Sequence, residues 1–218
     1  MKIFNFSEYS SLYNKFLSEL RDAQIQKDSM RFRKNLVRLG EISAYELSKS
    51  LDYHPLSTNT PLGTSTTQVP NDNIVLATIL RAGLPLHNGL LNYFDTAENC
   101  FISAYRKHTS AEDFEVEIEY LASPSLEGKV VLLSDTMLAS GQSMILAYKA
   151  LLKKGQPSNI HIVSVIGSQQ GINLVSEIFP DNTTLWIGAV DPKMTTQSYI
   201  VPGLGDAGDL AFGEKDDE

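Results

Sequence analysis

The segment KVVLLSDTMLASGQSMILAYKALLKKG, residues 129 to 155, has the residue pattern of a phosphate-binding turn. An apolar run ends at Asp135, small and hydroxylated residues follow, and a helical stretch begins after Gly141. Backbone N–H groups at a helix N-terminus point toward an anion, and Gly141 permits close approach of the backbone. Ser140 and Ser143 add hydroxyl donors, and Asp135 can accept hydrogen bonds from ribose hydroxyls. An ordinary capped turn is the alternative, and the chain has no P-loop motif.

A second candidate site is the run SYIVPGLGDAGDLAFG, residues 198 to 213. Four glycines and a proline from Pro202 to Gly213 argue against a regular element and expose backbone N–H and C=O groups to a ligand. Such a backbone can recognise the edge of a flat heterocycle such as a pyrimidine, with Asp206 and Asp209 as additional polar groups. By composition alone, a turn-rich segment packed on the sheet is the simpler interpretation.

Two arginines follow apolar runs: Arg81 comes after IVLATIL and Arg106 after CFISAY. At the end of a strand in a parallel sheet, an arginine is well placed to bind phosphate or diphosphate through its planar fork of donors. Taken singly, each is interpreted equally well as a structural ion-pair partner. Because both have the same placement, the pattern favours a shared role in anion binding.

The elements that must position these residues alternate, after Asn73, between apolar runs and helical stretches. This alternation predicts an α/β fold with a doubly wound, mainly parallel central sheet. In this fold class, ligands bind at the carboxyl ends of the strands. The predicted strands are 74–80, 100–105, 129–135, 160–167 and 184–190, and the predicted helices are 84–94, 141–154 and 169–178.

Three segments lie outside this alternation. Apolar positions in the first fifty residues predict helices at 8–22 and 29–50, the second with Ser29 as its N-cap. Residues 54–73 are rich in Pro, Ser, Thr, Asn and Gly and are predicted to be irregular. Strict alternation in DFEVEIEY predicts a half-exposed strand, part of a loop and β-arm excursion off the sheet at 106–121.

Composition predicts one globular domain over residues 1–218, with 42% hydrophobic and 20% charged residues. The formal net charge of −8 disfavours nucleic-acid binding. We see no signal-peptide pattern and no apolar run near the roughly 18 residues of a membrane span, and Cys100 is the only cysteine, so we expect a cytoplasmic protein without membrane partners. The predicted parts are a helical segment (about 1–53), a linker (about 54–73), an α/β core (about 74–197) and a C-terminal binding segment (about 198–213).

Three motifs together resemble those of the uracil phosphoribosyltransferase family: ILRAGL, DTMLASGQS, and YIVPGLGDAGD followed by FG. The similarity runs from about residue 20 to Gly213, and the last motif is specific to that family rather than to its fold. The resemblance implies the type I phosphoribosyltransferase fold. It also implies a pentosyltransferase that moves the ribose 5-phosphate group from 5-phosphoribosyl 1-diphosphate (PRPP) to N1 of uracil, giving UMP and diphosphate in pyrimidine salvage.

The resemblance also implies roles for individual residues. Asp135, Arg106 and Asp206 are the catalytic candidates. The uracil-binding positions are Ile200, Gly205, Asp206 and Ala207. The PRPP-binding positions are Arg81, Arg106, Asp135, Thr136, Met137, Leu138, Ala139, Ser140, Gly141, Gln142, Ser143 and Asp206.

Magnesium in this family is bound mainly through PRPP, and no protein metal site is expected, because the four histidines are scattered along the sequence. The resemblance further implies a homo-oligomer, a dimer or tetramer. The chain departs from the family motif DPMLATGGS at Thr136, Ser140 and Gln142, and Leu210 stands where a basic residue is common. These departures leave two alternatives: a catalytically weak paralogue that binds PRPP or UMP as a sensor, and a phosphoribosyltransferase with shifted base specificity.

Overall fold

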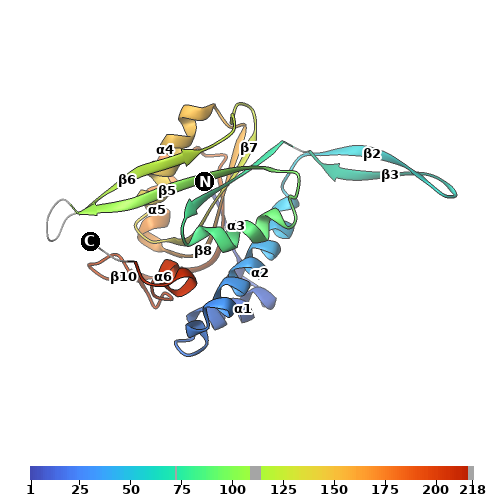
Figure 1. Ribbon diagram of the computed structural model, residues 1–218. Helices are drawn as coiled ribbons and strands as arrows, with labels where there is room; N and C mark the ends of the chain where they lie inside the picture. Colours follow the sequence, from blue (N-terminus) through green and yellow to red (C-terminus); the bar gives the residue numbers. More distant parts are fainter. Residues whose placement is uncertain (72, 109–113, 216–218) are drawn as a thin grey trace.

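A seven-stranded sheet with the order β1-β9-β8-β7-β4-β5-β6 forms the centre of the protein (Figure 1). The computed structural model describes the backbone of residues 1–71, 73–108 and 114–215. Side chains are described for these residues except those within 104–117. All neighbouring strands are parallel except β5 and β6. The strands are β1 (Lys2–Asn5), β4 (Ile74–Leu80), β5 (Glu98–His108), β6 (Phe114–Ala122), β7 (Val130–Leu138), β8 (Asn159–Ser168) and β9 (Thr184–Asp191).

Helices cover both faces of this sheet, which confirms the predicted doubly wound α/β class. One face packs on α1 (Leu12–Arg21), α2 (Ser29–Ser48), α3 (Gly83–Leu91) and α6 (Ala207–Phe212). The other face packs on α4 (Gln142–Leu151) and α5 (Gln169–Ile178). Successive side chains of a strand point to opposite faces of the sheet. When helices cover both faces, side chains on either face must therefore be mostly apolar. In β7, Leu132 faces the first layer, while Val131 and Leu133 face the second.

Predicted and observed elements differ in detail around this sheet. The strand predicted to end at Asp135 continues to Leu138, and its register with β8 pairs Asp135 with Ser164 and Leu138 with Gly167. The helix predicted to extend to Lys154 ends as α4 at Leu151 and is followed by a 3₁₀ turn. Strand β1, which was not predicted, adds a parallel edge strand beside β9.

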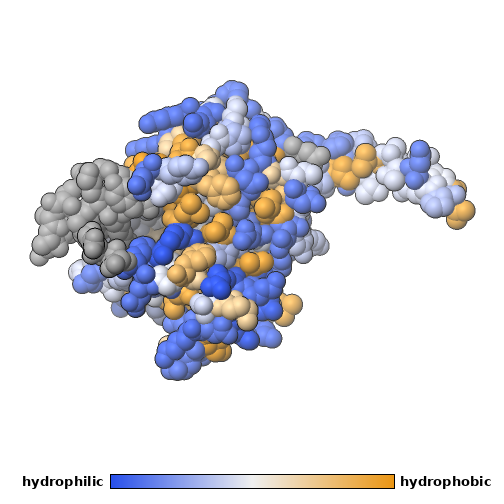
Figure 2. Space-filling view, viewed as in Figure 1, coloured by the Kyte–Doolittle hydropathy of each residue, from blue (hydrophilic) through white to orange (hydrophobic). Residues whose placement is uncertain are grey.

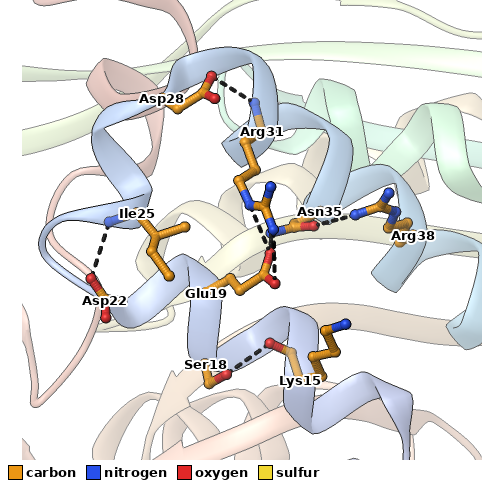
Figure 3. A network of polar contacts seen from close by, with 9 residues as sticks. All are labelled: Lys15, Ser18, Glu19, Asp22, Ile25, Asp28, Arg31, Asn35 and Arg38. Atoms are coloured by element: carbon orange, nitrogen blue, oxygen red, sulfur yellow. Dashed lines mark hydrogen bonds and ion pairs between the residues drawn. The ribbon is translucent and has the colours of Figure 1, made fainter.

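A polar network joins α1 to α2 (Figure 3). Glu19 accepts hydrogen bonds from Arg31 Nε at 3.0 Å and from Asn35 Nδ2 at 2.8 Å, and these contacts lower the pKa of its carboxyl. Asp28, whose side chain accepts from Arg31 N, is the N-cap of α2. The prediction of Ser29 as the N-cap was therefore wrong by one residue, and Asp is an equally good capping residue.

Residues 54–73 are not irregular, contrary to prediction. They contain an antiparallel hairpin of β2 (Tyr53–Thr60) and β3 (Gly63–Pro70) that projects from the body of the molecule (Figure 1). Its backbone ladder and polar contacts such as Ser57 Oγ to Thr66 Oγ1, 3.2 Å apart, maintain the pairing. Every residue of β2 is exposed, so the sequence carries no apolar alternation that would reveal a strand.

The predicted excursion at 106–121 is also revised. The backbone of β5 continues to His108 and pairs with β6, so that the hairpin extends the edge of the central sheet rather than leaving it. Of the strand predicted from DFEVEIEY, residues 114–120 are confirmed as part of β6, while Asp113 and the predicted loop at 109–112 lie outside the described residues. Ile118 packs against the core, but Tyr120 is exposed despite its place in the apolar alternation. No helix of the described residues has the length and apolarity needed to cross a membrane.

Two glycines let α2 and α3 pack with their backbones in contact. A Cβ at Gly89 would overlap the carbonyl oxygen of Val37 and lie 2.8 Å from the Cα of Gly40, and a Cβ at Gly40 would overlap the carbonyl oxygen of Leu86. A single backbone atom cannot move without moving its helix. Any side chain at Gly40 or Gly89 would therefore push the two helices apart. This contact holds α3, and hence the turn after β4, close to the N-terminal helices.

We expect Gly89→Ala to lower the free energy of unfolding by about 1–3 kcal/mol, the usual cost of overpacking, even though alanine favours helix. Denaturant unfolding followed by circular dichroism measures the change. Asn88→Ala, at the exposed neighbouring position of α3, is the matched control and should leave stability nearly unchanged. Equal stability of the two variants would contradict this packing argument.

Candidate functional site

The turn between β7 and α4 lies at the carboxyl edge of the sheet. Residues 139–141 form bends, Gly141 has a left-handed φ of 83°, and no side chain caps α4 at Gly141. The first helical hydrogen bond runs from Ile145 N to Gly141 O. The amide of Gln142 has only a long contact of 3.5 Å to Ser140 Oγ. The N-terminus of α4 therefore presents amides suited to an anion.

Helix α5 holds this turn from behind. Ser168 Oγ donates to Ala139 O at 2.6 Å and accepts from Gly171 N at 2.9 Å. A Cβ at Gly171 would overlap Ala139 O, and a Cβ at Gly141 would lie 3.0 Å from Gly171 O. Packing on α5 thus favours glycine at position 141 in addition to the positive φ, a reason the sequence did not reveal.

Thr136, Met137 and Leu138 were predicted together with the turn, but the structure places them within β7. Thr136 is buried, and its Oγ1 donates to Ala82 O at 2.7 Å, which ties the end of β7 to the turn after β4. Met137 packs against the first core layer and Leu138 is buried in the second. Of the predicted segment, residues 139–143 form the turn and the start of the helix.

Asp135 lies in β7 just before this turn, with a half-buried side chain. Burial raises the pKa of its carboxyl to about 7, and the backbone amides of Thr136 and Met137 partly offset that effect. The backbone oxygen of Asp135 accepts from Ser164 Oγ of β8 at 2.9 Å, which fixes the strand position. A carboxyl with a perturbed pKa at the edge where ligands bind in this fold class is a candidate functional group.

Arg81 lies beside the C-terminal segment. Its Nη2 donates to Asp209 Oδ1 at 3.1 Å and to Gly213 O at 3.2 Å. The structure therefore brings the first and third motifs together. Arg106 belongs to β5, where its backbone pairs with Val116, and its side chain is outside the described part of the chain.

The C-terminal segment was predicted to lack regular elements, but it contains β11 (Ile200–Val201), paired with β10 (Lys193–Met194), and helix α6. Asp206 is the N-cap of α6, and its Oδ1 accepts from Gly208 N at 2.8 Å and Asp209 N at 3.0 Å. The aspartate thus starts a short helix, which the glycine content concealed.

The predicted base-binding positions differ in how they can meet a ligand. Ile200 and Ala207 are buried in the core, so their side chains anchor the segment and their backbone atoms are what remains for recognition. Gly205 has a φ of 89°, which a residue with a side chain rarely adopts. The arrangement fits recognition of a flat heterocycle by backbone groups.

Two residues that the sequence analysis missed hold this segment in place. Asp191, buried at the end of β9, forms a two-point ion pair with Arg21 of α1, each N to O distance being 2.8 Å. Asp191 Oδ2 also accepts from Gly203 N at 3.1 Å, and Arg21 donates to Gly203 O at 3.0 Å. An acidic residue ending an apolar strand, as in TLWIGAVD, was the signal available in the sequence.

Within the described residues, no three His, Cys, Asp or Glu side chains cluster as metal ligands would. Asp191, Asp206 and Asp209 are occupied by Arg21, by the α6 cap and by Arg81. His161 is buried, accepts at Nδ1 from Trp186 Nε1 at 3.2 Å, and has a pKa lowered by burial to about 4.

Comparisons with known proteins give a consistent result. A sequence profile described as uracil phosphoribosyltransferase matches residues 9–214. A uracil phosphoribosyltransferase of Porphyromonas gingivalis is 55% identical over 215 residues, covering 99% of this chain and 100% of that protein. One from Methanococcus maripaludis is 40% identical over 201 residues, covering 91% and 84%.

Two solved structures are similar to this chain in fold. The AQ2163 protein from Aquifex aeolicus has a TM-score of 0.86 at 29% identity, covering 97% of this chain and 98% of that one. A hypoxanthine phosphoribosyltransferase from Staphylococcus aureus has a TM-score of 0.50 at 16% identity, covering 74% and 76%. At that identity the second likeness concerns the fold alone.

The raised pKa of Asp135 predicts a pH-dependent stability effect. The folded protein disfavours the ionised carboxyl, so this group costs stability as pH rises from its ordinary pKa of 3.8 to about 7. Asp135→Asn removes that cost, and we expect it to raise Tm more at pH 8 than at pH 4. Thermal unfolding at both values measures this, with Asp181→Asn on an exposed aspartate as the control. An identical change in Tm at both pH values would contradict it.

Proposed function

This chain belongs to the uracil phosphoribosyltransferase family, and from that premise we propose that it joins uracil N1 to the 5-phosphoribosyl group of PRPP, releasing diphosphate and forming UMP in pyrimidine salvage. One observation carries the proposal: three motifs from distant parts of the chain meet at one edge of the sheet. Thr136, next to Asp135, contacts Ala82, and the adjacent Arg81 contacts Asp209. These contacts join four parts of the proposed site: the N-terminus of α4, the carboxyl of Asp135, the guanidinium of Arg81 and the base-binding segment.

The β7–α4 turn is the proposed site of the 5-phosphate. The amides of residues 140–143 and the hydroxyls of Ser140 and Ser143 can donate to the phosphate oxygens, aided by the α4 dipole. Asp135 can accept from the ribose hydroxyls. Such hydrogen bonds favour the charged carboxylate, so we expect PRPP binding to lower the pKa of Asp135 from its value of about 7.

The diphosphate side is assigned to Arg81 and Arg106. The bond from the ribose anomeric carbon to diphosphate breaks as the bond to uracil N1 forms, and N1 releases its proton to the solvent, so negative charge grows on the leaving group. Arginine donors held in place before reaction stabilise that charge. Mg²⁺ bound to PRPP would supply further charge neutralisation.

Uracil is assigned to backbone groups of Ile200, Gly205 and Ala207, with Asp206 at the junction with PRPP. Because Asp206 Oδ1 caps α6, we assign its Oδ2 to the ligand. Fixing both substrates beside each other supplies much of the rate, since the reaction then becomes effectively intramolecular. A strong protein nucleophile is not required by this chemistry. The buried thiol of Cys100 is free and unused, which fits a reducing cytoplasmic setting.

We further propose that two copies of the chain associate through the β2–β3 hairpin. An isolated two-stranded hairpin is marginally stable in water, yet this one projects from the body of the molecule (Figure 2), with every residue of β2 and most residues of β3 exposed. It carries apolar side chains at Tyr53, Leu56 and Leu62, which are 42%, 48% and 100% exposed. A two-fold dimer would cover both hairpins at once, because each copy gives and receives the same surface.

We expect purified protein with Mg²⁺, PRPP and labelled uracil to form UMP and diphosphate, and to form no nucleotide from cytosine, hypoxanthine or orotate. Chromatography of the labelled products measures this. Product from another base would establish shifted specificity. PRPP binding without product from any base would establish the sensor alternative, for which the exposed side chain of Gln142 at the start of α4 is the structural reason.

We expect wild-type protein to be a dimer in sedimentation experiments, and the double variant Leu56→Ser, Leu62→Ser to dissociate at least about tenfold more readily, since apolar area at the interface is lost. Leu12→Ser, at a residue of α1 that is 66% exposed, makes the same chemical change outside the hairpin and should leave association unchanged. A wild-type monomer, or equal dissociation of all three proteins, would exclude this interface.

A further inference from the structure

The contact between Arg81 and Asp209 joins the turn after β4 to helix α6. Both hydrogen bonds of the arginine use the same nitrogen: Nη2 donates to Asp209 Oδ1 at 3.1 Å and to Gly213 O at 3.2 Å. Because Nη2 carries two N–H bonds, these acceptors occupy both. Nη1 has no acceptor within the described residues, so the outer end of the guanidinium is available to a ligand.

This contact is poorly suited to stabilise the fold. The side chains of Arg81 and Asp209 are 39% and 33% exposed, and ion pairs at such positions contribute about 0–1 kcal/mol. Helix α6 has other anchors: Asp206 caps its start, and Arg33 of α2 donates to Ala211 O at its end at 2.6 Å. Removing Asp209 would therefore leave α6 in place.

The contact is suited to orient Arg81. An arginine side chain has several rotatable bonds, and fixing it costs entropy that binding must otherwise supply. Asp209 and Gly213 each accept a hydrogen bond from Nη2, and these two hydrogen bonds fix the orientation of the guanidinium plane. The remaining donors are thereby fixed before any ligand arrives.

We propose that Asp209 is a positioning residue for Arg81, orienting the guanidinium so that its outer nitrogen meets the diphosphate of PRPP. This inference rests on the proposed function, since PRPP is the ligand. Asp209 itself does not touch the diphosphate, because its carboxylate and the phosphates carry like charges and repel each other. Its position in α6 also links the base-binding segment to the diphosphate side.

The test is a double-variant cycle on binding of Mg²⁺-PRPP, measured by isothermal titration calorimetry. We expect Asp209→Ala to weaken binding by about fivefold or more, and Asp209→Asn, which keeps an acceptor at the same place, to weaken it less. In an Arg81→Ala background, Asp209→Ala should have no further effect, because it acts through the arginine. Glu46→Ala, which removes the carboxylate of an exposed pair with Lys49, should bind as the wild type does.

Steady-state kinetics gives a second readout. Asp209→Ala should raise KM for PRPP by a similar factor and change KM for uracil by less than about twofold, whereas a general loss of structure would move both. Tighter binding by Asp209→Ala would show that Asp209 competes with the diphosphate and would overturn the proposal. Equal effects of Asp209→Ala with and without Arg81 would overturn it too. Wild-type protein that binds no PRPP would overturn the proposed function as well.

Discussion

Burial of both faces of the central sheet is the constraint on which the rest of the structure depends. Apolar side chains of β4, β7, β8 and β9 alternate between two helical layers, and buried polar side chains among them, such as Ser134 and Ser164, donate to backbone oxygens. The charged groups lie toward the carboxyl ends of the strands: Asp135 near the end of β7, Arg81 directly after β4 and Asp191 at the end of β9. The topology thus gathers at one edge residues that are far apart in sequence.

Glycines and hydroxyls then set the distances at that edge. Gly171 and Ser168 press the β7–α4 turn onto α5, while Thr136 ties β7 to the turn after β4. These contacts are short and are made largely to backbone atoms. A substitution that disturbs them therefore cannot be accommodated by moving a side chain. The amides of the turn are consequently held in position without any ligand.

Much of the fold and of the candidate site was predictable from the sequence, because a strand that is buried on both faces consists almost entirely of apolar residues. The five central strands, the helices between them and the β7–α4 turn follow from that pattern. The hairpin β2–β3 was not predicted, because its exposed Thr and Ser residues show no alternation of apolar side chains. Helix α6 was not predicted, because it is short and lies in a glycine-rich segment. The pairing of Asp191 with Arg21 was not predicted either: the strand TLWIGAVD marks Asp191 as an acidic strand end, but nothing local identifies a partner 170 residues away.

That same contact sets an order for folding. The ribosome makes Arg21 long before Asp191 and Gly203, so α1 emerges without the partners that its last residue contacts in the finished protein. Closing so long a loop costs entropy, and the same holds for the pairing of β1 with β9 at the edge of the sheet. The ion pair that holds the base-binding segment can therefore form only when nearly the whole chain has been made, and a growing chain contains its anion-binding turn before its base-binding segment.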